Sequence, residues 1–145
     1  MLTIRRDKEI HREEGGWFSA RWHFSFAHYR DPDNDAFGAM RVFNDDRLVP
    51  GAIWPMHPHQ DASVHVASLA PGDRVEHPLG PGRGAYAYLI DGQARFDGEP
   101  VATGDAAKVT GQPSLEITAE APSELILVDV PLAFRPVGIW AGQGG

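Results

Sequence analysis

The sequence predicts an all-β protein, built as a sandwich or a small barrel. Its 145 residues include 16 Gly and 12 Pro, which favour turns and short strands over long helices. No stretch of ten or more residues has a convincing helical period. In the second half, short apolar runs alternate with turns rich in Gly, Asp, Pro and Ser, which is typical of strands in a closed sheet. These runs span residues 64–69, 85–90, 94–96, 106–109, 115–118 and 125–130.

The first half carries a weaker strand pattern. Residues 17–26 alternate aromatic and polar side chains, which predicts a half-buried strand. In that register His23 lies on the face opposite Trp22, at the surface or in an interface. Residues 40–43 are strand-like, and the acidic run 44–46 is interpreted as a turn.

Composition excludes several classes of protein. The chain has no Cys, so disulfides, thiolate metal sites and a Cys nucleophile are excluded. It has 20 acidic and 13 basic residues and shows no basic face, which argues against direct nucleic-acid binding. No signal peptide and no apolar run of membrane-spanning length is present, so we expect a cytoplasmic protein without membrane contact.

Several segments resemble pirin-like proteins of the cupin superfamily. The first 60 residues match the family's opening in Gly16-Trp17-Phe18, in the run 24–27, in 41–46 and in His57-Pro58-His59. The remainder resembles the family's second cupin through Leu69-x-x-Gly72, Arg83-x-Ala85, Gly92, Gly104-Asp105 and the closing 127–131. The resemblance implies a single cupin (RmlC-like) β-barrel, or double-stranded β-helix, with an N-terminal strand arm.

This resemblance also predicts the domain organisation. A single cupin domain spans 1–134, with pirin-like N-terminal strands in 1–60 and a second-cupin-like barrel core in 61–134. Residues 135–145 form a Gly-rich C-terminal tail. Pirins usually carry two cupins, so this chain is interpreted as a relative that lacks the core of the first.

The resemblance gives an incomplete metal-ligand set. In pirin-like proteins the first cupin holds a metal through three His and one Glu. His57 and His59 match the family's His-Pro-His pair, but Ser63 stands where a Glu ligand is expected, and no later His-x-Glu segment follows. The second cupin generally lacks a metal, and here its own motif positions are apolar.

The residues themselves leave the metal question open. On a strand, His57 and His59 would point to one side about 6.6 Å apart, so both imidazoles could meet one ion. His77 or Glu76 from the next hairpin is the better third ligand, whereas Asp61 would need a bend in the strand. The site would take one divalent ion, Fe, Ni, Mn or Zn. The alternative is that the pair is a hydrogen-bonded relic.

A ligand pocket is the second candidate site. Tyr86 and Tyr88 share a strand face and, with Arg83, could meet a small aromatic ligand at the barrel mouth. Tyr86 and Tyr88 are equally explained as core residues with satisfied hydroxyls, and Arg83 by a pair with a carboxylate of its own surface. His65 is expected to point outward if its neighbouring valines fill the barrel.

Two function classes remain at this level, and the sequence does not decide whether the chain is an enzyme. The missing ligands favour a non-catalytic or weakly metal-binding module for a small molecule or a protein partner. The alternative implied by the resemblance is a metal-dependent quercetin 2,3-dioxygenase-like activity. In either case exposed sheet edges and aromatic faces predict a homodimer, with the N-terminal strands exchanged or not.

Overall fold

The computed structural model describes residues 1–50 and 63–134, and in these ranges the chain is nearly all strand. Two 3-10 helices, η1 (Asp7–Glu9) and η2 (Pro32–Asn34), are the helical elements there. The strands are β1 (Leu2–Arg5), β2 (His11–Glu14), β3 (Phe18–Trp22), β4 (Asn44–Leu48), β5 (Ser63–Leu69), β6 (Arg74–Pro78), β7 (Arg83–Asp91), β8 (Gln93–Phe96), β9 (Glu99–Ala102), β10 (Ala106–Val109), β11 (Ser114–Ala119) and β12 (Ser123–Pro131). The all-β prediction is confirmed.

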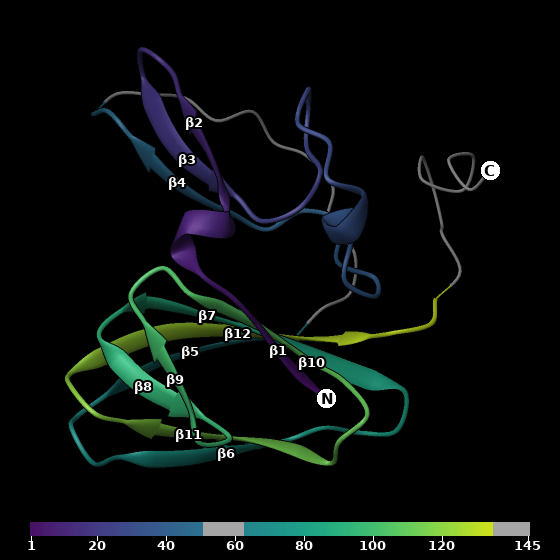
Figure 1. Ribbon diagram of the computed structural model, residues 1–145, viewed down its shortest axis with the longest axis vertical. Coiled ribbons are helices and arrows are strands. Elements are labelled where there is room, and N and C mark those ends of the chain that lie inside the picture. The colour runs from purple at the N-terminus through teal and green to yellow at the C-terminus, as the bar shows by residue number, and fades with distance from the viewer. Residues whose placement is uncertain (51–62, 135–145) are drawn as a thin grey trace.

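Two antiparallel sheets face one another in the barrel (Figure 1). One has the strand order β1-β10-β7-β12-β5 and the other β6-β11-β8-β9. All six predicted strands of the second half are present. The tight turn between β8 and β9 uses Asp97 and Gly98, both with positive φ, as a two-residue hairpin requires.

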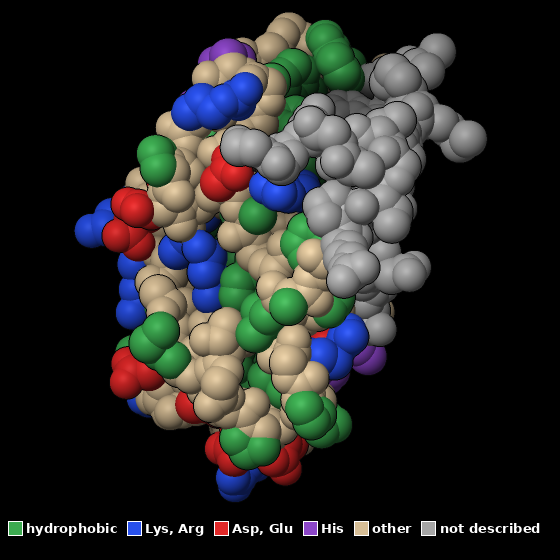
Figure 2. Space-filling view, turned by 90° about the vertical axis from the view of Figure 1, so that its right-hand side faces the viewer, with side chains coloured by type: hydrophobic (Ala, Val, Ile, Leu, Met, Phe, Trp, Pro, Cys, Tyr) green, Lys and Arg blue, Asp and Glu red, His purple; other side chains and the backbone are tan. Residues whose placement is uncertain are grey.

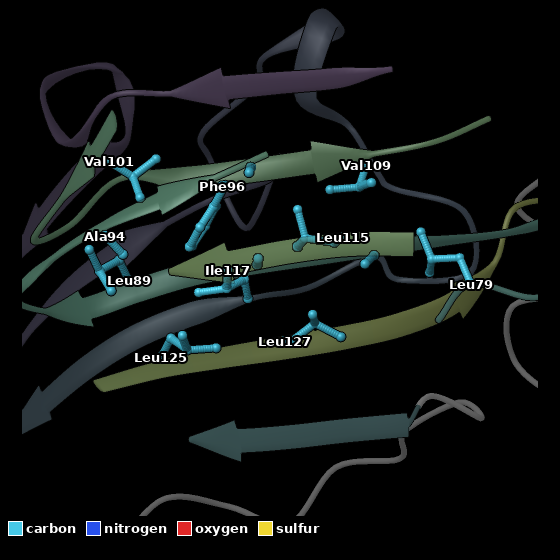
Figure 3. Close-up of a cluster of buried hydrophobic side chains, with 13 residues drawn as sticks. Leu79, Leu89, Ala94, Phe96, Val101, Val109, Leu115, Ile117, Leu125 and Leu127 are labelled. Carbon is cyan, nitrogen blue, oxygen red and sulfur yellow. The ribbon is translucent and has the colours of Figure 1, made fainter. Parts of the chain in front are cut away.

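The space between the two sheets is filled by apolar side chains. Leu89, Phe96, Val109 and Leu115 are fully buried there, and the labelled side chains converge between the strands (Figure 3). Their alternation with outward residues follows from the period of two along a strand. This first core cluster therefore leaves the middle of the barrel packed rather than hollow.

The N-terminal arm is a separate three-stranded sheet, β2-β3-β4, that lies on the side of the five-stranded barrel sheet, away from β6, β8, β9 and β11 (Figure 1). The first strand, β1, does not belong to it: β1 pairs with β10 inside the barrel sheet. The chain reaches the arm through η1. The N-terminus therefore ties both parts together.

A second core cluster joins the arm segments to the barrel. The outward face of β7 and β12 carries Tyr86, Tyr88 and Val130, and these pack against Phe24 and Phe37. Both faces of β7 are consequently buried, one by the barrel and one by the arm segments. This contact covers the predicted N-terminal arm without a second chain.

Three expectations for the first half are wrong. Residues 40–43 form no strand, since Met40 makes only an isolated bridge to Phe37 and β4 begins at Asn44. The strand predicted over 17–26 ends at Trp22, after which the chain leaves the sheet. The acidic run 44–46 is not a turn but the start of β4, where Asp45 lies opposite Arg21. An acidic strand is stable here because Arg21 compensates its charge across the sheet.

The surface drawn in Figure 2 mixes acidic, basic and apolar side chains, without a continuous basic tract on that face. Among the described residues, no helix has the length and apolar character needed to cross a membrane.

Candidate functional site

The barrel mouth carries a polar cluster centred on Asp129. His77 Nε2 lies 3.0 Å from Asp129 Oδ2, and Arg83 Nε donates to Asp129 Oδ1 at 2.5 Å. A second Arg83 nitrogen, Nη2, donates to the carbonyl oxygen of Asp129 at 3.1 Å. The side chain of Asp129 is only 10% exposed, so this carboxylate is enclosed by its two partners.

These contacts distinguish between the two alternatives for Arg83, a ligand-binding side chain and an ion pair with a carboxylate. Of the two alternatives for Arg83, the structure has the pair with a carboxylate of its own chain. The Nε2 atom of His77 contacts the same carboxylate. The predicted metal partners His57 and His59 lie outside the described residues, so the predicted set of three ligands stays a prediction.

His65 adds a second imidazole to the mouth, against expectation. Val64 and Val66 are 61% and 71% exposed, so they do not fill the barrel. Strand alternation instead places His65 on the inward face with Ala67 and Leu69. Its ring centroid lies 4.8 Å from that of His77. His65 was expected to point outward if the valines fill the barrel, and this condition is not met because the valines lie on the outer face.

The predicted pocket of Tyr86, Tyr88 and Arg83 is divided between the two faces of β7. Arg83 lies on the inward face at the mouth, while both tyrosines face the N-terminal segments and are at most 2% exposed. The Tyr88 hydroxyl donates to Asp45 Oδ2 at 2.7 Å. Burial raises the pKa of both phenols well above the usual value of 10. These tyrosines are core residues with satisfied hydroxyls.

His23, which the sequence predicted at the surface or in an interface, lies in the core. It is completely buried, and its Nδ1 lies 2.8 Å from the Tyr86 hydroxyl. Burial, reinforced by the nearby Arg5 charge, lowers its pKa from 6.5 to about 3, so the imidazole is neutral at pH 7. The missed signal was the end of the strand at Trp22, which turns His23 inward.

A shallow hollow lies on one face of the arm sheet. Arg12, Arg21, Asp45 and Arg47 line it, and its volume is about 80 Å³. Small-molecule sites usually occupy roughly 300 Å³ or more. Arg21 is already paired with Asp45 at 3.1 Å and with Asp7 at 2.9 Å. This hollow is too small for a flavonol.

The opposite face of the arm sheet holds a separate group of potential metal ligands. Donor atoms of His11, Glu13 and His28 all lie within 4.8 Å of one another. No sequence pattern indicated this group, because His28 is remote along the chain and His11 lies in a charged leader.

Known proteins resemble this chain in sequence over parts of its length. The family model described as the quercetinase C-terminal cupin domain matches residues 54–130, which is more than half of the chain. A pirin-like protein of Caulobacter vibrioides is 51% identical over 49 residues, which are 34% of this chain and 21% of that protein. The quercetin 2,3-dioxygenase of Escherichia coli K12 is 40% identical over 65 residues, 44% of this chain and 28% of the enzyme. The chain thus spans between a fifth and about three tenths of the length of the curated relatives it matches.

The fold has a counterpart among solved structures. The bacterial pirin YhhW of Escherichia coli, in a crystal structure with nickel(II), superposes with a TM-score of 0.79 at 17% identity. The superposition covers 90% of this chain and 99% of that chain. At this identity the likeness shows the fold alone. The family match over 54–130 establishes that the chain belongs to the pirin-like proteins of the cupin superfamily.

Proposed function

We propose that this chain is a non-catalytic binding module, a pirin-like cupin whose barrel no longer supports metal chemistry. The observation that carries the proposal is the filled barrel: Ala85, Phe96 and Leu115 in its interior are all 0% exposed. A cupin that activates oxygen needs a metal with open coordination positions, and this barrel resembles the family's second cupin, which generally carries no metal. Packed apolar side chains leave no such position among the described residues of the barrel.

The polar mouth supports the same proposal. Asp129 is the one carboxylate of the mouth cluster, and both of its oxygens are engaged by His77 and Arg83. The contact with Asp129 occupies Nε2 of His77, which leaves only its Nδ1 atom for a metal. The described mouth is an ion-paired rim in which His77 is the one imidazole bound to the carboxylate.

The donor set of the chain fits the family's metal poorly. Three His and one Glu are required, and the chain offers His57 and His59 with Ser63 in the place of the Glu. His77, the third predicted ligand, is held by Asp129. We therefore derive no oxygenase step for this chain.

A quercetin 2,3-dioxygenase-like activity is the second candidate. The favouring observation is the similarity to relatives that carry this name, such as the Escherichia coli enzyme at 40% identity. The similarity covers only 28% of that enzyme, so its activity does not transfer with the match.

Oxygen uptake separates the two candidates. Untagged protein is loaded in turn with Fe²⁺, Ni²⁺, Mn²⁺ or Zn²⁺, and oxygen consumption is followed with quercetin as substrate. The proposal predicts no consumption above the protein-free metal control. Turnover that disappears in a His57→Ala/His59→Ala variant would overturn it in favour of the dioxygenase.

The same samples test the predicted small aromatic ligand. Because the hollow on the arm sheet is smaller than a flavonol, the proposal favours a protein partner over a small molecule. Tryptophan fluorescence should then show no saturable change during a titration with quercetin. Saturable quenching at micromolar quercetin would make the module a small-molecule binder.

A second copy of the chain is the partner we propose. Among the described residues β5 is an edge strand of the five-stranded sheet, and it exposes Val64 and Val66. An exposed apolar edge favours pairing with another strand, and homodimers are the commonest assemblies. Light scattering after size exclusion should give about twice the 15.9 kDa of the chain. Val66→Lys should give the monomer, and Val42→Lys, which also replaces an exposed valine, should not; a wild-type monomer contradicts the proposal.

A further inference from the structure

The face of the arm sheet that carries Trp22 also brings together two imidazoles and a carboxylate. His11 Nε2 lies 3.1 Å and His28 Nε2 lies 3.2 Å from the same oxygen, Glu13 Oε2. The donor atoms of the three residues all lie within 4.8 Å of one another. None of these residues belongs to the barrel or to the family's His-Pro-His pair.

Local structure positions each donor. His11 and Glu13 are two residues apart on β2, so their side chains lie on one face. His28 comes from a two-residue turn that is closed by paired backbone hydrogen bonds between Phe26 and Tyr29. The first residue of this turn, Ala27, has a φ of 48°. The turn therefore folds His28 back over β2.

Aromatic packing fixes the orientation of the imidazoles. The His11 ring is stacked on Tyr29 at 4.1 Å between centroids with 14° between the planes. Trp22 lies beneath both imidazoles, 5.3 Å from the His11 ring and 5.4 Å from the His28 ring. Preorientation of this kind lowers the entropy that a ligand must overcome when it binds.

The donor chemistry and the spacing match one class of ligand. Two imidazoles and a carboxylate are the ligand set of Zn²⁺ sites that keep an open position. Tetrahedral bonds of about 2.0–2.2 Å place two ligand atoms about 3.4 Å apart. The two distances from imidazole nitrogen to carboxylate oxygen are 3.1 and 3.2 Å, and all three donor atoms lie within 4.8 Å of one another. We propose that His11, Glu13 and His28 bind a divalent first-row transition-metal ion of the zinc type.

Exposure leaves this site open to solvent. The side chains of His11 and Glu13 are 28% and 25% exposed, and that of His28 is 70% exposed. An ion held here keeps at least one position for water or an outside ligand. Binding would also clip the turn that carries His28 to β2, and so stabilise the arm.

The alternative explanation of this geometry is hydrogen bonding without a metal ion. Without a metal, Glu13 accepts hydrogen bonds from one or both imidazoles, and the three residues form an ordinary surface ion-pair group. The two explanations differ in what a carboxamide does at position 13. A Gln can still accept a hydrogen bond from an imidazole but is a far weaker ligand for a metal ion.

Calorimetric titration of the untagged full chain with zinc chloride tests the proposal. The wild type should bind one equivalent, and Glu13→Gln and His28→Ala should each weaken that binding at least tenfold. His28 is largely exposed, so its replacement leaves the fold intact. The His57→Ala/His59→Ala variant is the control, and it should bind zinc at this site as the wild type does.

Two outcomes overturn the proposal: unchanged zinc affinity in His28→Ala and Glu13→Gln, or loss of all zinc binding in the His57→Ala/His59→Ala control. A second readout guards against misfolded variants. Zinc should raise the melting temperature of the wild type and of the control, and should leave that of a folded His28→Ala unchanged. The site is independent of the proposed non-catalytic role, because oxygen uptake with quercetin can be absent whether or not zinc binds to the arm.

Discussion

His23 is a titratable side chain sealed into an aromatic core. Phe43, Tyr86 and Tyr88 surround its ring at centroid distances of 4.8, 5.6 and 4.7 Å. Burial and the Arg5 charge lower its pKa from 6.5 to about 3. Between these two pH values the unfolded chain binds a proton that the folded chain does not. Its contribution to stability is therefore complete above about pH 6.5 and is lost as the pH falls towards 3.

The pH dependence of stability should report this residue directly. On lowering the pH from 7.5 to 5.0, we expect the free energy of unfolding of the wild type to fall by about 2 kcal/mol more than that of His23→Asn. The variant is less stable at pH 7.5 but lacks the titrating group. Urea unfolding at both pH values measures the difference. Equal losses in the two proteins would show that His23 is not protonated on unfolding in this range.

Strand periodicity predicts individual faces only where one face of a strand meets solvent. It correctly placed Tyr86 and Tyr88 on one face of β7. Because both faces of β7 are buried, alternation could not tell the barrel side from the arm side. For His23 the error was the length of the strand. Its backbone N–H bonds to the carbonyl of Phe43 across the end of β3, a contact between segments distant in sequence.

At the scale of elements, the arm segments meet the barrel at a second tight turn. Phe37 and Met40 pair their backbones around Gly38, and the next residue, Ala39, donates to the carbonyl of Pro131 on β12. Gly38 has a φ of +55°, and a Cβ there would lie 2.4 Å from that carbonyl oxygen. Only glycine satisfies both the turn and the close approach.

Gly38→Ala should therefore destabilise the protein more than a positive φ alone explains. Gly98 is the matched control, because it also lies in a two-residue turn with positive φ but would meet no atom within 4 Å. We expect Gly98→Ala to cost about 1 kcal/mol and Gly38→Ala at least about 3 kcal/mol of unfolding free energy. Similar costs in chemical denaturation would mean that the arm segments do not pack on β12 at this turn.

The strands that the sequence predicted and those that it missed differ in burial. The six predicted in the second half include the apolar strands of the core. β6 and β9 were missed, since β6 is largely exposed and charged and β9 contains Pro100. β4 was interpreted as a turn from its Asn and Asp residues, whose partner Arg21 lies 24 residues earlier. Edge strands of this kind are defined by their neighbours and not by their own composition.

At the scale of the whole molecule, arm and barrel share one core. The second cluster contains Ile10 and Phe24 from the N-terminal segment and Tyr86 and Val128 from the barrel. Neither part can unfold alone without exposing this apolar surface. We expect a single cooperative transition.

Two probes check this cooperativity. In a variant with Trp54 and Trp140 replaced by Phe, tryptophan fluorescence follows the N-terminal arm, which holds the buried Trp22, and far-ultraviolet circular dichroism follows the strands of the whole chain. The two urea transitions should coincide in midpoint and slope. A fluorescence transition at clearly lower urea would show that the arm unfolds independently.

The fold class and the family could be predicted because turn spacing and short motifs are local features of the chain. The candidate metal group in the arm could not, because it depends on how the turn at His28 folds back over β2. The ion-paired mouth was visible only as an alternative for Arg83, since its partner Asp129 lies 46 residues away.

The metal content of untagged protein, measured by mass spectrometry beside His57→Ala/His59→Ala and His28→Ala variants, tests most directly whether the barrel has lost its metal chemistry. We predict that the His57→Ala/His59→Ala variant carries as much metal as the wild type, and that His28→Ala carries less. Near-stoichiometric iron, nickel, manganese or zinc in the wild type that vanishes in the His57→Ala/His59→Ala variant would contradict this prediction. It would place a working metal centre at the family's His-Pro-His pair.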